Sequence, residues 1–242
     1  MVIGNNTLSV MNIIKYWLID SYYAFKGRVA VVLYRRPPKH YLGYILENKI
    51  PVILIPGIGT KWAYLKKLGD RISLEGHAVY IVTKLGMNFI DIPKSAGIVR
   101  EFVDEKNIKN GIILAHSKGG LIGKYFLIHQ NKDNHILGMI SIATPYVGAK
   151  LAKIVPLKPF KELTPASKII QDLQSNTTIN KKIISIFPAF DNFVSQDKQL
   201  LYGAENIVVK VKGHNKVLFS SETEDLVVKS LEKMSITNKF KL

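Results

Sequence analysis

From residue 51 onward, short apolar runs alternate with amphipathic segments. Aliphatic and β-branched runs bounded by turn residues favour buried strands, and apolar positions recurring every three to four residues favour helices. The expected strands are 51–55, 77–83, 111–115, 136–143, 183–187 and 207–211. The expected helices are 61–74, 94–106, 118–130, 165–173 and 222–234. This alternation predicts an α/β fold with a mostly parallel central sheet and helices on both faces.

Two parts of the chain depart from this pattern. Between residues 144 and 180 the alternation loosens, and we expect a small cap at about 145–180, between the strands near 143 and 182. The first 45 residues precede the alternating pattern and predict a helix over 8–34. We therefore divide the chain into a helical extension, residues 1–45, and a main domain, residues 46–242, that carries the cap.

The helical extension is rich in aromatic residues but is interrupted by charges such as Lys15, Asp20 and Lys26. It contains no uncharged apolar stretch of 18 residues, which disfavours a membrane-spanning helix, and it has no clear signal-peptide pattern. The extension either packs on the main domain or lies on a membrane surface, and we favour packing. A cytoplasmic or peripheral-membrane location is the corresponding expectation.

The most informative local feature is Ser117, which stands between the apolar run Gly111–Leu114 and the helical segment 118–130. A strand, a sharp turn with a serine and a helix together are typical of a nucleophile elbow. Such a turn requires small residues two positions before and after the serine, and these are Ala115 and Gly119. A serine that merely caps the helix is the alternative interpretation.

An acid and a histidine follow the serine, each just past a predicted strand. Asp191 follows strand 183–187, and His214 follows strand 207–211. In an open α/β sheet, sites form at this carboxyl edge. Asp197, six residues after Asp191, is the fallback acid. His116 adjoins the serine but is expected to point away from it and to help order the turn.

Five segments together resemble the α/β-hydrolase superfamily, and within it the small bacterial lipases and esterases. The resemblance covers roughly residues 50–235 and includes the chain order serine, acid, histidine. Two positions depart from the pattern, because the elbow has Ala115 in place of glycine and the loop after the first strand has Pro56 in place of histidine. The segments are Ile55–Gly59, Ala115–Gly120, Ser141–Pro145, Asp191–Val194 and Gly213–His214.

The resemblance implies an α/β-hydrolase fold and a serine hydrolase site. Ser117 would be the nucleophile, His214 the general base and Asp191 the acid that orients the histidine. Two backbone N–H groups, those of Ile58 and Lys118, would form the oxyanion hole, and the side-chain charge of Lys118 would be incidental. The remaining expected substrate-binding residues are Gly57, Thr60 and Trp62, although core packing explains Trp62 equally well.

Composition limits the possible partners. The 242 residues include no cysteine, and no residues have metal-ligand spacing, so we expect neither a metal nor another cofactor. The 34 Lys and Arg residues against 18 Asp and Glu give a net charge of +16. No nucleic-acid recognition motif accompanies this charge, so we expect no specific nucleic acid; an anionic membrane surface or biased genome composition explains it instead.

Three functions remain open. The first is hydrolysis of carboxylic esters, small-molecule or lipid, through an acyl-enzyme on Ser117. The second is an acyltransferase that uses the same three residues and passes the acyl group to another acceptor. The third is a catalytically silent protein of the hydrolase fold that binds a membrane or a partner.

Overall fold

The computed structural model describes residues 9–149 and 158–239 and contains one six-stranded sheet, in which all neighbouring strands are parallel. The strand order is β2-β1-β3-β4-β5-β6, so that β3 lies in the interior between β1 and β4. The strands are β1 (Val52–Ile55), β2 (Val79–Ile81), β3 (Gly111–His116), β4 (Ile136–Ile142), β5 (Ile183–Phe190) and β6 (Glu205–Lys212). The predicted parallel sheet is confirmed.

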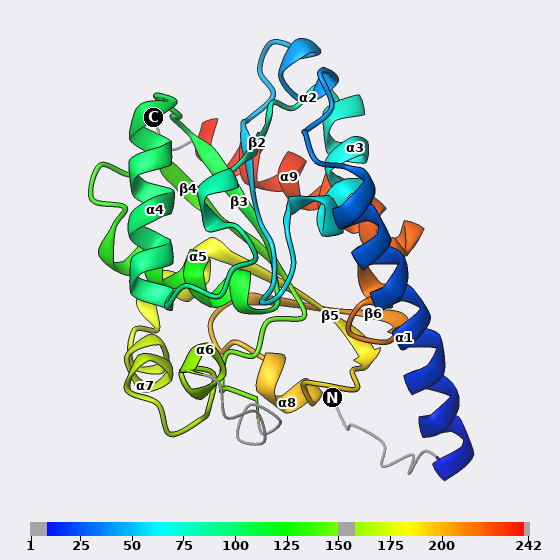
Figure 1. Ribbon diagram of the computed structural model, residues 1–242. Coiled ribbons are helices and arrows are strands. Elements are labelled where there is room, and N and C mark those ends of the chain that lie inside the picture. Colours follow the sequence, from blue (N-terminus) through cyan, green and yellow to red (C-terminus); the bar gives the residue numbers. More distant parts are fainter. Residues whose placement is uncertain (1–8, 150–157, 240–242) are drawn as a thin grey trace.

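Helices cover both faces of this sheet, and each face has its own apolar core. On one face pack α4 (Ile92–Glu105) and α5 (Lys118–His129), and on the other pack α3 (Lys66–Leu74) and α9 (Ser221–Lys239) (Figure 1). The interior strands are buried on both sides, as the run Gly111–His116 illustrates, because parallel sheets of this kind are sandwiched between helices. The predicted covering of both faces is confirmed.

The segment between β4 and β5 carries the short helix α6 (Lys158–Lys161) and the helix α7 (Lys168–Ser175). Both lie at the end of the molecule opposite the short helix α2 (His40–Gly43), together with α8 (Gln196–Gln199) (Figure 1). The expected cap at 145–180 falls partly on residues 150–157, which lie outside the described residues.

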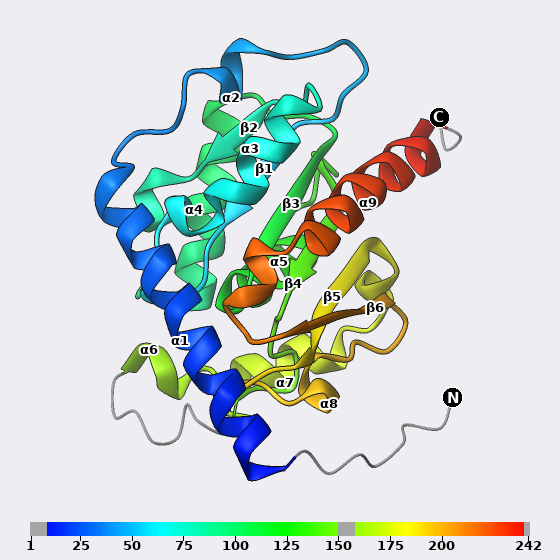
Figure 2. The ribbon, with the colours of Figure 1, turned by 90° about the vertical axis from the view of Figure 1, so that its right-hand side faces the viewer.

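The helix α1 (Val10–Leu33) runs along one side of the molecule (Figure 2). It begins at Ser9, whose side chain accepts a hydrogen bond from the backbone N–H of Asn12. It packs against the 3₁₀ turn Trp62–Leu65 and against a second 3₁₀ turn, Lys216–Phe219, which follows β6. Gly27 allows this close packing, because a Cβ at that position would lie 2.3 Å from the ring of Tyr64. Within the described residues, no helix combines the length and apolarity needed to cross a bilayer.

Candidate active site

The turn from β3 to α5 holds Ser117 in an unusual conformation. Its φ of 52° and ψ of −122° lie outside the regions that residues with a side chain ordinarily adopt. The backbone N–H of Ser117 donates to the carbonyl of Ile142 at 2.9 Å, and its own carbonyl accepts a hydrogen bond from Thr144 Oγ1 at 3.2 Å. The neighbouring strand β4 thus holds a strained turn in place, as a nucleophile elbow requires.

Gly119 shows why the turn demands small residues. A Cβ on Gly119 would lie only 2.3 Å from the carbonyl oxygen of Ile55 at the end of β1. Ala115, two positions before the serine, is completely buried in β3. At Gly119 the turn approaches the first strand so closely that a larger side chain would force the backbones apart.

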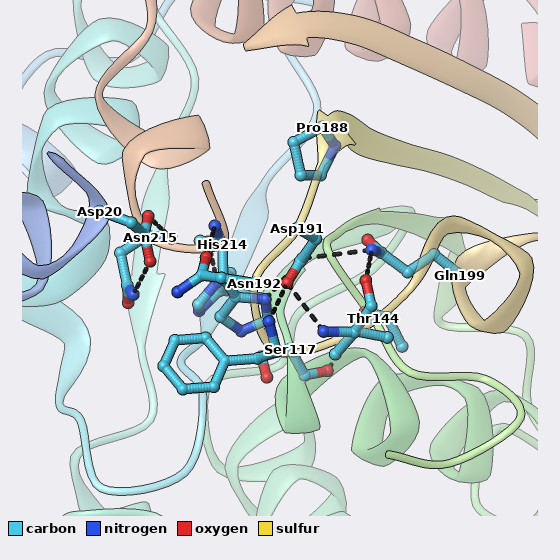
Figure 3. A network of polar contacts seen from close by, with 12 residues as sticks. Asp20, Ser117, Thr144, Pro188, Asp191, Asn192, Gln199, His214 and Asn215 are labelled. Carbon is cyan, nitrogen blue, oxygen red and sulfur yellow. Dashed lines mark hydrogen bonds and ion pairs between the residues drawn. The ribbon is translucent and has the colours of Figure 1, made fainter. Parts of the chain in front are cut away.

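Asp191 and His214 lie in contact although they follow different strands. His214 Nδ1 and Asp191 Oδ2 are 2.7 Å apart, and the Asp191 side chain is fully buried (Figure 3). The other carboxylate oxygen, Oδ1, accepts hydrogen bonds of 2.8 Å from the backbone N–H groups of Phe193 and Val194. Gln199 Nε2 donates to Oδ2 at 3.2 Å. These donors stabilise an ionised carboxylate and fix its direction toward the histidine.

The protonation of His214 reflects opposing effects. Burial disfavours the charged imidazolium, but the negative charge of Asp191, its hydrogen bond to the ring and the charge of Asp20 outweigh burial. The pKa of His214 is therefore raised above its ordinary value. A carboxylate that accepts the Nδ1 proton also leaves Nε2 as the basic nitrogen of the neutral ring.

His116 connects the elbow to the histidine loop. Its Nε2 lies 3.2 Å from the backbone carbonyl of His214, so this nitrogen carries the proton and donates it. Burial and the nearby His214 hold the pKa of His116 well below its usual value, so the ring is neutral. His116 therefore links the last residue of β3 to the loop that carries His214, and its role in ordering the serine turn stays a prediction.

Ser117 and His214 line the same cavity, of about 300 Å³. Apolar side chains from several parts of the chain supply most of its wall, and the largest come from Phe160, Leu163 and Phe193. Ala24 and Arg28 of α1 complete one side. A larger cavity of about 420 Å³ beside the edge strand β2 is lined by neither serine nor histidine. Cavity volume alone therefore does not identify the candidate active site.

The loop after β1 borders the same cavity with Gly57, Ile58 and Thr60. Thr60 Oγ1 donates to the carbonyl of Gly57 at 2.8 Å, which ties the loop together. The loop lies next to the elbow because β1 and β3 are adjacent strands. Ile58 thus lines the same cavity as Ser117, and Lys118 directly follows the serine at the start of α5.

Comparison with solved structures identifies the architecture. No protein-family model matches the sequence. The mature form of Bacillus licheniformis lipase BlEst2 superposes with a TM-score of 0.63 at 14% identity, over 78% of this chain and 95% of the lipase. The Mar Chica lagoon metagenome α/β hydrolase MGS-MChE2 gives a TM-score of 0.58 at 17% identity, over 76% and 91% of the two chains. The chain has the α/β-hydrolase fold.

A further structural neighbour of this α/β-hydrolase fold is a monoacylglycerol lipase from Paleococcus ferrophilus. It has a TM-score of 0.55 at 12% identity and matches 77% of this chain and 96% of its own. The fold expected from the sequence is therefore confirmed. At such low identity the likeness concerns the fold, and the chemistry depends on the residues of this chain.

Two residues considered for the site from the sequence, Trp62 and Asp197, do not line the cavity. Trp62 does not line it but packs in the apolar core, with its ring centroid 6.1 Å from that of Tyr41. Core packing, the alternative left open for Trp62, thus describes its position. Asp197, the fallback acid, lies in α8 beside Lys198 with 65% of its side chain exposed, whereas Asp191 is the carboxylate in contact with His214.

The Lys118 side chain has more partners than the sequence suggested. Its Nζ is fully buried, lies 2.7 Å from Glu162 Oε1 and donates to the carbonyl of Ile90 at 2.6 Å. Glu162 Oε2 also accepts from the backbone N–H of Ile92, at 2.9 Å. The expectation that this charge is incidental is therefore wrong, because it joins the elbow to the segment after α6.

From the sequence, Asp20 is only one of the charges that interrupt the aromatic extension and is not a candidate site residue. It is completely buried in α1 and accepts hydrogen bonds from the segment that follows His214. A lone acid in an aromatic helix carries no local signal for a partner nearly 200 residues away. In the part of the chain that the structure describes, no group of three or more His, Asp or Glu side chains could hold a metal ion.

Proposed function

We propose that this protein is a serine hydrolase that cleaves carboxylic esters through an acyl-enzyme on Ser117. The observation that carries the proposal is the 2.7 Å contact between Asp191 Oδ2 and His214 Nδ1, with Ser117 and His214 in the wall of one apolar cavity. The strained backbone of Ser117 supports it further, because a serine that only caps a helix needs no such strain.

In the proposed reaction, Ser117 Oγ attacks the ester carbonyl carbon while His214 Nε2 takes the hydroxyl proton. The backbone N–H groups of Ile58 and Lys118 donate to the resulting oxyanion, and the positive end of α5 adds to this stabilisation. The carbon–oxygen bond to the alcohol then breaks, and the alcohol leaves with the proton from His214. Water, deprotonated by His214, then attacks the acyl carbon, the bond from that carbon to Ser117 Oγ breaks, and His214 returns the proton to Oγ as the acid leaves.

The substrate class follows from the cavity wall. Ile58, Phe160, Leu163 and Val194 present apolar surface, which favours an apolar acyl group over a charged one. The lipase structures that superpose on this chain are consistent with acyl esters as substrates. We therefore propose esters of aliphatic acids, including lipid esters, and no cofactor.

The decisive experiment is Ser117→Ala together with an active-site label. Hydrolysis of p-nitrophenyl esters of increasing chain length should fall to background in the variant, while the circular dichroism spectrum and melting temperature stay those of the parent. A serine-directed fluorophosphonate should label Ser117 in the parent protein. Labelling of Ser141 or Ser195 in its place, or full activity of the variant, would contradict the assignment.

The same assay separates the two other functions. Adding a primary alcohol should leave the acid as the main product if water is the natural acceptor. Transfer of most of the acyl group to the alcohol would favour an acyltransferase. Neither hydrolysis nor labelling of the parent protein would indicate a catalytically silent protein of this fold.

We further propose that α1 places the cavity at an anionic lipid surface. One side of α1 exposes a stripe of large apolar side chains at helical spacing, each more than half exposed. The stripe extends along a helix of 24 residues, about 36 Å in length. We call this set the outer stripe of α1: Met11, Ile14, Leu18, Tyr22, Phe25 and Val32.

Charge supports a lipid surface rather than another apolar partner. Six exposed basic residues lie in α1 and the segment after it, whereas the only acid between residues 10 and 46 is the buried Asp20. Each basic residue near an anionic bilayer contributes about 1 kcal/mol. Because Ala24 and Arg28 line the cavity, such docking would bring its mouth to the lipid. The basic residues are Lys15, Lys26, Arg28, Arg35, Arg36 and Lys39.

A further inference from the structure

The helix α1 forms hydrogen bonds with the loop that carries His214 through the carboxylate of Asp20. Asp20 Oδ1 accepts hydrogen bonds from the backbone N–H groups of Asn215 at 2.7 Å and Lys216 at 2.9 Å. Asp20 Oδ2 accepts from Asn215 Nδ2 at 2.8 Å (Figure 3). These donors include the first N–H groups of the 3₁₀ turn after His214, so Asp20 caps that turn from another element of the fold.

The surrounding groups restrict the loop further. Asn215 Oδ1 accepts a hydrogen bond of 2.5 Å from Tyr64, so the Asn215 side chain is held at both ends. The N–H of Gly213 donates to the carbonyl of Phe190 at 2.7 Å, and that of His214 donates to Asn192 Oδ1 at 3.1 Å. The loop on both sides of His214 is thus fixed in space, and α1 supplies the part that follows the histidine.

Gly213 shows how closely Asp20 approaches. A Cβ on Gly213 would lie 2.4 Å from Asp20 Oδ1, and the glycine has a φ of 128°, which few other residues adopt. The carboxylate therefore packs directly against the backbone that carries His214. Figure 3 shows Asp191 on one side of the histidine and the Asp20–Asn215 pair on the other.

We propose that Asp20 is a positioning residue of the active site, which acts on the ester-cleaving reaction by fixing the backbone that carries His214. This proposal rests on the proposed function, because an effect of Asp20 on catalysis requires that His214 is the base. An aspartate suits this role because its two oxygens accept from three donors, whereas an asparagine would direct its own N–H groups at one of them. A displacement of the base by about 1 Å can cost on the order of 100-fold in rate.

Asp20 also acts on His214 through its charge. The charged or titratable groups that face the imidazole are Asp191 from the loop after β5, Asp20 from α1 and the neutral His116 from β3, while Arg28 of α1 lies in the cavity wall. The Asp20 charge favours the protonated ring, although less than Asp191 does. Removing it should lower the pKa of His214.

The test is Asp20→Asn, which keeps the size of the side chain and removes its charge. We expect kcat/KM at the pH plateau to fall about 10- to 100-fold, mainly in kcat, because the base is less well placed. We also expect the acidic limb of the pH profile to move to lower pH. An NMR titration of the His214 Cε1–H signal should show the same lowering in the resting protein, without any substrate.

Tyr16→Phe is the matched control. Tyr16 lies on the same helix, one turn before Asp20, and its hydroxyl accepts a hydrogen bond of 2.7 Å from Lys212 Nζ, so the variant also removes one polar contact between α1 and the domain. It should change neither the rate nor the titration. Equal changes in both variants, or an unchanged rate and titration in Asp20→Asn, would overturn the proposal.

Two further outcomes are distinguishable. If Asp20→Asn fails to fold, Asn215→Ala removes one of the three hydrogen bonds to Asp20, that of Asn215 Nδ2, and keeps the two backbone donors. We then expect a smaller loss of kcat, and a kcat that remains unchanged there would overturn the proposal. If the parent protein cleaves no ester, the proposed function fails. The NMR titration then decides the role of Asp20 alone, and a lowered pKa of His214 in Asp20→Asn but not in Tyr16→Phe still supports it.

Discussion

Asp191 and Asp197 lie six positions apart in the sequence, yet their environments are opposite. Asp191 is buried, accepts from two backbone N–H groups and contacts His214 Nδ1, whereas Asp197 is mostly exposed and pairs with Lys198. A carboxylate can hold a histidine tautomer only if it is fixed and shielded from water. These contacts distinguish the two acids.

We expect Asp191→Asn to reduce kcat on the order of 10⁴-fold, because the amide no longer selects the tautomer with a basic Nε2. Asp197→Asn should change kcat less than about twofold, since its partner Lys198 lies outside the cavity. Steady-state kinetics on one p-nitrophenyl ester measures both variants. A larger loss in Asp197→Asn would mean that the acid has been assigned to the wrong residue.

The positions of Ser117, Asp191 and His214 could be read from the sequence because each one directly follows a strand of the same parallel sheet. That relation is local, and the carboxyl edge of the sheet then brings the three together. Asp20 and the Lys118–Glu162 pair could not be found in this way, because their partners are set by tertiary packing. Trp62 illustrates the same limit: its sequence position beside the oxyanion loop does not determine which way the ring points.

The segment after α6 is joined to the elbow by a buried charge pair. Glu162 contacts Lys118 Nζ and caps the start of α4 through the N–H of Ile92. Its neighbours Phe160 and Leu163 line the cavity. The position of this part of the wall therefore depends on an ion pair formed next to the proposed nucleophile.

Glu162→Gln should destabilise the protein by about 3 kcal/mol, because it leaves the fully buried Lys118 cation without a counter-charge. It should also raise KM for long-chain esters by displacing the cavity wall. Denaturant unfolding and ester kinetics measure the two effects. The control Glu105→Gln removes the exposed contacts with Lys84 and Lys106 and should leave both quantities essentially unchanged. Equal changes in the free energy of unfolding and in KM for the two variants would contradict a stabilising role of the buried Lys118–Glu162 pair.

The types of the main helices and strands could be predicted from hydrophobic periodicity, whereas several of their boundaries could not. The helix observed at 10–33 agrees closely with the expected 8–34, and β6 extends beyond the expected 207–211 to Glu205–Lys212. The 3₁₀ turns and the four-residue helices were not predicted as separate elements, because such short segments show no detectable hydrophobic periodicity. They are held by tertiary contacts, as the turn after His214 is held by Asp20.

The net charge of +16 and the outer stripe of α1 predict salt-sensitive binding to anionic vesicles. The protein should co-sediment with phosphatidylcholine–phosphatidylglycerol vesicles at low salt and less with pure phosphatidylcholine. Leu18→Ser combined with Phe25→Ser should reduce binding at least several-fold, since both side chains are about two-thirds exposed.

Tyr202→Ser serves as the control, because Tyr202 is 90% exposed but belongs to the segment between α8 and β6 and not to the outer stripe of α1. It should bind vesicles as the parent does. Equal binding of all three proteins would rule out the stripe as the lipid contact. A parent dimer that becomes a monomer in the double variant, without any vesicle binding, would show that the stripe is covered by a second copy of the chain.

The hydrogen bonds of Asp20 join positions 195 residues apart, and this distance has a consequence in time. A ribosome adds about 5 to 20 residues per second, so α1 exists for roughly 10 to 40 s before its partner loop has been made. In the later part of that interval the nascent chain contains Ser117 but neither His214 nor the segment that Asp20 holds. The loop that carries the proposed base can take its final position only after β6 has been made and α1 has docked against it, so the proposed site is completed late in synthesis.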